Sequence, residues 1–250
     1  MCSLFANGQY TVMKVSVIIP AYNEEQCLLE TLERIDRALS IADCSSEIIV
    51  VDNDSQDKTK QVAEAFGAKV FLETKHNIGK VRNTGAENST GDLLIFIDAD
   101  TLVPETLFQK ITAVMEDEKC FGGAVAVEYE DFKRKWMKYY LAGWKFWGRF
   151  FNMAQGAAQF CRKFVFEELK GYDQTIFIGE DIKSYWRLSK YTKRNNGYLH
   201  FVEHPKVKTS ARRFDKMSLW KTYLLTHPIF IRLTWRKNYY WKDWYEKAVR

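Results

Sequence analysis

The chain has 250 residues, of which 46% are hydrophobic and 28% are charged, with a formal net charge of +5. This length suits one α/β domain, or one domain with an appended subdomain, and the hydrophobic content is ample for a core. The five cysteines are widely spread without a C-x-x-C pair, which argues against a zinc site or a disulfide framework and favours the cytoplasm. No signal peptide is visible, and no apolar run approaches the roughly 18 residues that cross a bilayer.

The pattern up to residue 100 alternates between strand and helix. After a loose leader before Lys14, we predict strands over residues 15–19, 47–51, 69–72 and 93–97, and helices over about 26–39, 58–66 and 81–88. Several of these strands end in polar loops that carry acids. Alternating β and α elements predict a Rossmann-like, mostly parallel sheet flanked by helices, with one ligand crevice at the carboxyl ends of the strands.

Two aspartates, Asp98 and Asp100, follow the buried strand over residues 93–97. In extended backbone, side chains two positions apart point the same way and lie roughly 6.5–7 Å apart. Two carboxylates held this close repel each other unless a cation lies between them. Oxygen ligands favour a hard ion, so we expect Mg²⁺ or Mn²⁺ here.

The phosphate-binding glycine motifs of other α/β proteins are missing. The first loop reads Pro20-Ala21-Tyr22-Asn23-Glu24 instead of G-x-G-x-x-G, and no G-x-x-x-x-G-K-[ST] motif occurs. An NAD enzyme and a P-loop NTPase are therefore disfavoured.

The second half of the chain is basic and aromatic. We expect a helix from Pro104 to about Asp117, a strand over 121–127, a basic aromatic helix over 132–151, and a helical tail over 216–250. The 132–151 segment and the tail fit a membrane interface, with rings buried and cations on headgroups. The alternatives for the 132–151 segment are a core helix with snorkelling lysines and, less favoured, a nucleic-acid stacking platform.

Four successive motifs resemble those of the family 2 glycosyltransferases, which have the GT-A fold: VSVIIPAYNEE, VVDNDSQDKT, HNIGKVRNTG and LLIFIDADT. The resemblance implies an inverting transferase that uses a nucleotide-diphospho-sugar, such as a UDP- or GDP-sugar, and a divalent metal. It implies a GT-A domain over 14–215, with a nucleotide-sugar half over 14–105 and an acceptor half over 120–215.

The resemblance also implies roles for individual residues. The donor-binding positions would be Pro20, Ala21, Tyr22, Glu24, Asp52, Asn53, Asp54, Lys80, Arg82, Asp98, Ala99, Asp100, Arg212 and Arg213. Asp98 and Asp100 correspond to the D-x-D motif that holds the metal and the diphosphate. Asn53 stands where the family usually has a second aspartate, which leaves the base less certain, although an amide oxygen still accepts a hydrogen bond.

The catalytic base is expected in the acceptor half. Glu180-Asp181 resembles the family's E-D motif at a helix start, after a strand-like run over 176–178. By position Asp181 is the base that takes the acceptor's proton, with Glu180 as runner-up. The alternative is that both acids only cap the helix.

Other residues leave alternatives open. His200, His204 and His227 are each candidate third metal ligands, although a lone histidine is more often structural. The Q-x-x-R-W motif of processive synthases is absent, so we expect one sugar per encounter with a sugar or lipid-linked acceptor, at the cytoplasmic face of a membrane. The rival functions are a sugar-phosphate nucleotidyltransferase and an inactive membrane- or glycan-binding module, and we expect no nucleic-acid partner.

Overall fold

The structure is a computed structural model that describes most of the chain. The described residues are 3–6, 9–42, 44–130, 156–211 and 228–237, with 136, 139, 140, 143, 154 and 220 described singly. The strands are β1 (Ser3–Ala6), β2 (Gln9–Val12), β3 (Val15–Ala21), β4 (Ser46–Asp52), β5 (Lys69–Leu72), β6 (Leu93–Ile97), β7 (Thr101–Leu102), β8 (Cys120–Glu130), β9 (Ala158–Arg162) and β10 (Tyr198–Ser210). The helices are α1 (Leu28–Ala42), α2 (Thr59–Phe66), α3 (Ile78–Glu87), α4 (Leu107–Met115), α6 (Lys163–Glu168), α7 (Glu180–Arg194) and α10 (Pro228–Thr234).

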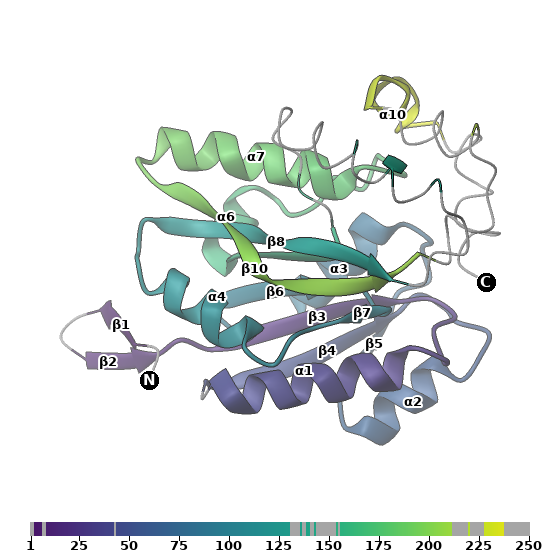
Figure 1. Cartoon of the computed structure of the whole chain (residues 1–250), viewed down its shortest axis with the longest axis horizontal. Coiled ribbons are helices and arrows are strands. Elements are labelled where there is room, and N and C mark those ends of the chain that lie inside the picture. Colours follow the sequence, from purple (N-terminus) through teal and green to yellow (C-terminus); the bar gives the residue numbers. More distant parts are fainter. Residues whose placement is uncertain are drawn as a thin grey trace.

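Eight strands form one mixed sheet in the order β5-β4-β3-β6-β9-β8-β10-β7 (Figure 1). Strands β5, β4, β3 and β6 are parallel, as the alternating pattern predicts. Strand β9 runs antiparallel between β6 and β8, with Ile95 opposite Phe160. The sequence halves 14–105 and 120–215 therefore share one sheet, because β6 of the first half pairs directly with β9 of the second.

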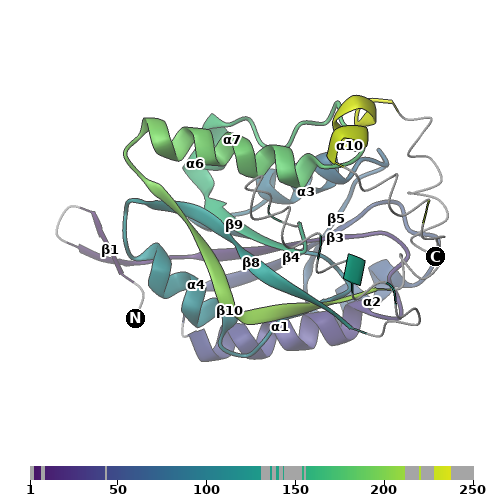
Figure 2. The same cartoon turned by 45° about the horizontal axis from the view of Figure 1, so that its top comes forward.

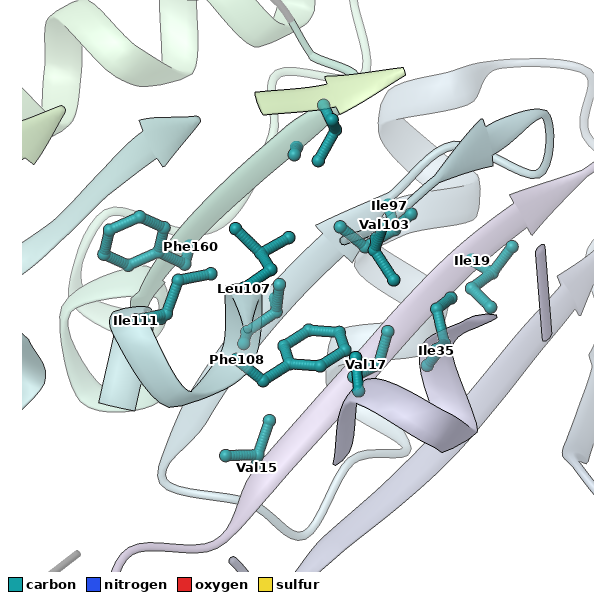
Figure 3. Packing of buried hydrophobic residues seen from close by; sticks show 14 of the residues in the cluster. Val15, Val17, Ile19, Ile35, Ile97, Val103, Leu107, Phe108, Ile111 and Phe160 are labelled. Carbon is teal, nitrogen blue, oxygen red and sulfur yellow. The ribbon is translucent and has the colours of Figure 1, made fainter. Parts of the chain in front are cut away.

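Helices cover both faces of the sheet, and alternate strand residues face each layer. Val15, Val17 and Ile19 of β3 pack with α1 and α4, where Figure 3 shows them near Ile35 and Phe108. The intervening Ile18 belongs to a second cluster with residues of α3, α6 and α7. Because side chains alternate along a strand, a strand buried on both faces reads as a continuous apolar run.

Two local predictions were wrong. The leader before Lys14 contains a hairpin, in which β1 pairs only with β2 and Ser3 lies opposite Val12. The run over residues 176–178, predicted to be strand-like, is a loop. Ile176 is fully buried there, and its carbonyl accepts a hydrogen bond from the Asn77 side chain rather than from a neighbouring strand.

The basic aromatic segments lie mostly outside the described residues. Trp136, Tyr139, Tyr140 and Gly143 are helical, and the rings of Trp136 and Tyr140 meet edge to face with centroids 6.0 Å apart. The rest of the 132–151 segment and much of the tail are not described. Among the described helices, none combines the length and the hydrophobicity needed to cross a membrane.

Candidate active site

The loops that follow β3 and β4 are tied to each other at the carboxyl edge of the sheet. The Glu24 amide donates to the Thr59 hydroxyl at 2.7 Å, and the Gln56 amide donates to Asn23 Oδ1 at 2.8 Å. Asn23 and Asp54 have φ of 55° and 60°, a left-handed conformation that asparagine and aspartate tolerate better than most residues. Residues of these two loops that we predicted to bind the donor are thereby brought side by side.

An aromatic pair stands in the same region. Tyr22 meets His76 edge to face, with ring centroids 5.0 Å apart. His76 was missed as a site residue by the sequence argument, although it opens the HNIGKVRNTG motif. Only that motif could have indicated it, because a lone histidine in a turn carries no periodic signal.

Asn53 is buried and its orientation is set by the neighbouring backbone. Its Nδ2 donates to the carbonyls of Glu73 and Lys75, at 2.5 and 3.1 Å. Both amide hydrogens are therefore used, and the Oδ1 atom is the group left to accept a hydrogen bond from a ligand.

Arg82 connects Asp98, which follows β6, with Glu180, the first residue of α7. The side chain is only 3% exposed, its Nη2 donates to Asp98 Oδ1 at 2.8 Å, and its Nη1 donates to Glu180 Oε1 at 2.6 Å. Burial alone would lower the pKa of Arg82, but the carboxylates of Asp98 and Glu180 outweigh it and raise this pKa. Arg82 is thus a buried, permanently charged bridge and not a surface cation.

The Arg82 guanidinium also lies against an aromatic ring, and one of its donors is unused. It lies 5.4 Å from the centroid of the Tyr172 ring, whose own pKa is raised by burial. Arg82 Nε is buried without a hydrogen-bond partner among the described residues. The Arg82 Nε–H group is therefore a buried hydrogen-bond donor that the described residues leave unused.

Asp181 lies next to this bridge. A Cβ atom added to Gly156 would come within 2.8 Å of Asp181 Oδ2 and 3.1 Å of Arg82 Nη2, so only glycine fits there. Asp181 is partly exposed, but its carboxylate lies inside the site. Burial and the neighbouring Glu180 carboxylate raise the pKa of Asp181 to about 7.

Asp98, Ala99 and Asp100 follow β6 as predicted, but they lie in a turn rather than in extended backbone, because the Thr101 amide donates to the Asp98 carbonyl at 3.0 Å. Asp98 is 36% exposed at its side chain, and Asp100 Oδ1 accepts a hydrogen bond from the Thr209 hydroxyl at 3.3 Å. Two carboxylates on a solvent-accessible turn fit a hard divalent ion that completes its shell with phosphate oxygens. The described residues contain no cluster of three or more His, Cys, Asp or Glu side chains suited to a metal.

Other predicted residues lie elsewhere. Lys80 pairs with Glu73 and Glu87, at 3.8 and 3.7 Å, rather than with the acids around Arg82. His200 lies opposite Gly123 near the amino end of β10, whereas Thr209, at the other end, is the residue that reaches Asp100. His204 is an exposed residue of the same strand. Arg212, Arg213 and His227 lie outside the described residues.

Comparison with known proteins identifies the family. The model of a family described as "Glycosyl transferase family 2" matches residues 16–170. A dolichol-phosphate mannosyltransferase of Pyrococcus furiosus is 36% identical over 110 residues, which cover 42% of this chain and 31% of that protein. The chain spans less than two thirds of the length of such curated relatives.

Solved structures show that the fold is the GT-A fold. A mannosyltransferase of Pyrobaculum calidifontis, in complex with GDP-Man and Mn²⁺, has a TM-score of 0.58 at 20% identity, covering 86% of this chain and 61% of that one. A glucosyl-3-phosphoglycerate synthase of Mycobacterium tuberculosis, in complex with Mn²⁺, UDP and its product, has a TM-score of 0.58 at 19% identity, covering 90% and 80%.

Proposed function

The chain belongs to glycosyl transferase family 2, and from this premise we propose that it is a metal-dependent, inverting enzyme that moves one sugar from a nucleotide-diphospho-sugar to an acceptor. The observation that carries the proposal is the Arg82 bridge, which joins Asp98 at the end of β6 to Glu180, the neighbour of Asp181. Donor-side and acceptor-side acids thus stand in one connected site.

The donor base is recognised by the loops after β3 and β4. Tyr22, with His76 at its edge, offers a ring on which a base can stack, and Asn53 Oδ1 offers a hydrogen-bond acceptor. Uracil and guanine carry a ring N–H that can donate to this oxygen, whereas adenine and cytosine carry an acceptor at the corresponding ring nitrogen. We therefore propose a UDP- or GDP-sugar as donor.

The diphosphate is held at the end of β6. Asp98 and Asp100 would hold Mg²⁺ or Mn²⁺, as their carboxylates suit a hard ion. Such an ion, when bound, neutralises charge that develops on the leaving diphosphate. Arg82 adds the spare Nε donor to the same region, but its charge is offset by Asp98 and Glu180, so the metal would have to supply the positive charge that the diphosphate needs.

Asp181 is the proposed base. In an inverting transfer the acceptor hydroxyl attacks the anomeric carbon from the side opposite the diphosphate and gives up its proton. Glu180 Oε1 is ion-paired with Arg82 Nη1 at 2.6 Å, whereas Asp181 has no cation in hydrogen-bonding contact among the described residues. A pKa near 7 matches the task, because a base works best when its pKa is close to the working pH.

The proposed acceptor is a sugar or lipid-linked hydroxyl or phosphate. A relative of the chain is a dolichol-phosphate mannosyltransferase. The basic aromatic segment 132–151 is suited to an anionic lipid surface. We accordingly propose peripheral contact with a membrane that carries the acceptor.

A nucleotide-binding panel tests the donor proposal. Thermal unfolding is followed with UDP, GDP, ADP or CDP, each with Mn²⁺ and each again with EDTA. A nucleotide at 100 times its dissociation constant stabilises the fold by about 2.7 kcal/mol, so a binder is readily detected. We expect UDP or GDP to stabilise the protein only with Mn²⁺. Equal stabilisation by ADP and CDP would contradict the role of Asn53.

A further inference from the structure

The loop before α7 leads directly into Glu180 and Asp181, the first two residues of that helix, and one side of the loop is held by α3 and the turn before it. Asn77 Nδ2 donates to the Ile176 carbonyl at 2.9 Å, and Arg82 Nη1 donates to Glu180 at 2.6 Å. Between these two points lies Gly179, whose φ of +74° is a left-handed conformation. The backbone that sets the direction of Glu180 and Asp181 is therefore anchored at both ends on this side.

The opposite side of the same loop is held by the C-terminal segment around α10. The Phe177 amide donates to the Trp235 carbonyl at 2.7 Å. A Cβ atom on Gly179 would lie 3.1 Å from Ile231 Cγ2, so α10 packs directly on the residue before Glu180. Lys183 Nζ lies 5.1 Å from the centroid of the Trp235 ring and also pairs with Asp173. Figures 1 and 2 both show α10 next to the end of α7 that carries the acids.

The two faces of α10 differ in burial. Ile231 is 8% exposed and faces the loop, whereas Leu233, two positions later, is 70% exposed. The buried face of this short helix thus lies against the loop that leads into Glu180 and Asp181. An element of seven residues needs such tertiary contacts to be ordered, because helices this short are unstable alone.

We propose that the segment from Ile231 to Trp235 is a positioning element for Glu180 and Asp181. The inference rests on the proposed function and adds a role for the C-terminal segment. Ile231 and Trp235 touch no reacting atom; they fix the loop whose geometry aims the base at the acceptor. Catalysis is sensitive to such geometry, since a misplacement of about 1 Å can cost on the order of 100-fold in rate.

A matched pair of substitutions on α10 tests the proposal. Ile231→Asp places a charge on the buried face and should detach the segment, whereas Leu233→Asp places the same charge on the exposed face. Three quantities are measured in each variant. They are amide hydrogen exchange at residues 173–183, affinity for UDP and GDP with Mn²⁺, and release of nucleoside diphosphate from UDP-glucose, UDP-GlcNAc and GDP-mannose.

We expect exchange at the Phe177 amide to rise at least about 10-fold in Ile231→Asp, and turnover to fall at least about 10-fold, with nucleotide affinity within about twofold of the wild type. Leu233→Asp should match the wild type in all three. Trp235→Ala should resemble Ile231→Asp in milder form, and Trp235→Phe, which keeps a ring over Lys183, should restore turnover. If Ile231→Asp fails to fold, the Trp235 variants still test the proposal by the same three measurements.

Two results would overturn the inference. One is unchanged Phe177 exchange in both Ile231→Asp and Trp235→Ala, which would show that the segment does not hold the loop. The other is faster exchange with unchanged turnover, which would show that the loop needs no such support. A wild type that turns over none of the three donors would instead count against the proposed function, while the exchange comparison would still decide whether the segment holds the loop.

Discussion

Arg82 is the residue at which the two sides of the site meet. Its guanidinium is buried between Asp98 and Glu180, and the second partner lies 98 positions away in sequence. Breaking one side of a buried ion pair typically costs about 3–5 kcal/mol, because the remaining charge stays in a dry environment. We therefore expect Glu180 to hold Arg82 in place and Asp181 to be the acid that exchanges a proton.

The two acids should respond differently to neutralisation. We expect Asp181→Asn to lower transfer by a factor of about 10² or more with nearly normal nucleotide affinity, since it removes the base alone. Glu180→Gln should instead lower the free energy of unfolding by about 3–5 kcal/mol, because Arg82 loses a charged partner in a buried ion pair. Steady-state kinetics measure the transfer rate, and denaturant unfolding measures the free energy of unfolding. If Glu180→Gln abolishes transfer and Asp181→Asn does not, the roles are exchanged.

The raised pKa of Asp181 predicts a pH dependence. A base must be ionised to accept a proton, so transfer should rise with pH through about 7 and fall about tenfold for each pH unit below it. The profile of kcat/KM reports this limb for the free enzyme. The limb should vanish in Asp181→Asn, and an unchanged limb in that variant would assign it to another group.

At the scale of elements, β4 depends on a carboxylate at its start. Glu47 is buried and accepts hydrogen bonds from Ser16 and Thr90. It also forms an ion pair with Lys69 at 2.6 Å. Burial would raise the pKa of Glu47, but these partners outweigh it and hold it at about 2. The charged form thus ties β3, β4, β5 and the turn before β6 together at the amino edge of the sheet.

This depressed pKa has a definite sign for stability. The folded pKa of about 2 lies below the ordinary value of 4.5, so the contribution is complete above pH 4.5 and is lost as pH falls toward 2. We expect Glu47→Gln to lower the free energy of unfolding at pH 7 by about 1.5–3 kcal/mol and to flatten the acid dependence. Glu64→Gln is the control, because Glu64 is exposed and its ion pair with Lys60, at 3.7 Å, lies on the surface of α2. Equal effects of the two would contradict the account.

Local patterns predicted the elements better than their long-range contacts. The alternation of apolar strands and amphipathic helices correctly indicated β3 to β6 and α1 to α3, because those signals lie within each segment. The same signals did not indicate that β9 runs antiparallel, and they made a strand of residues 176–178. Strand direction and the partners of Ile176, such as Asn77, depend on segments far away in the chain.

The same limit applies to the site. The D-x-D motif put Asp98 and Asp100 directly after β6, and the E-D motif put Glu180 and Asp181 at a helix start. No spacing indicates that Arg82 joins these pairs, that Gly156 makes room for Asp181, or that Trp235 holds Phe177. Those contacts arise only when β6, α3, α7 and the C-terminal segment pack together.

At the scale of the whole molecule, the uneven charge predicts reversible binding to anionic membranes. The 132–151 segment has six cations and no acid, and each cation near an anionic surface adds about 1 kcal/mol. We expect co-sedimentation with vesicles that contain anionic lipid at low salt, and release at about 1 M salt, where the screening length falls to about 3 Å.

Charge reversal gives that prediction a control. Changing Lys133, Arg134 and Lys135 to Glu should remove most vesicle binding and leave donor hydrolysis intact. Changing the exposed residues Lys58, Lys110 and Lys190 to Glu should leave most of the vesicle binding. If the wild type does not bind anionic vesicles at low salt, the aromatic residues of this segment pack in the core or contact a protein partner instead.

The central claim is that Asp98 and Asp100 hold a metal that makes sugar transfer from a nucleotide-diphospho-sugar possible. The most direct measurement is the release of nucleoside diphosphate from UDP- and GDP-sugars by the wild type with Mn²⁺, by the wild type in EDTA, and by Asp100→Ala with Mn²⁺. We predict release only in the first case, with Asp100→Ala folded as judged by its thermal unfolding. Full release in EDTA or by Asp100→Ala would contradict the claim.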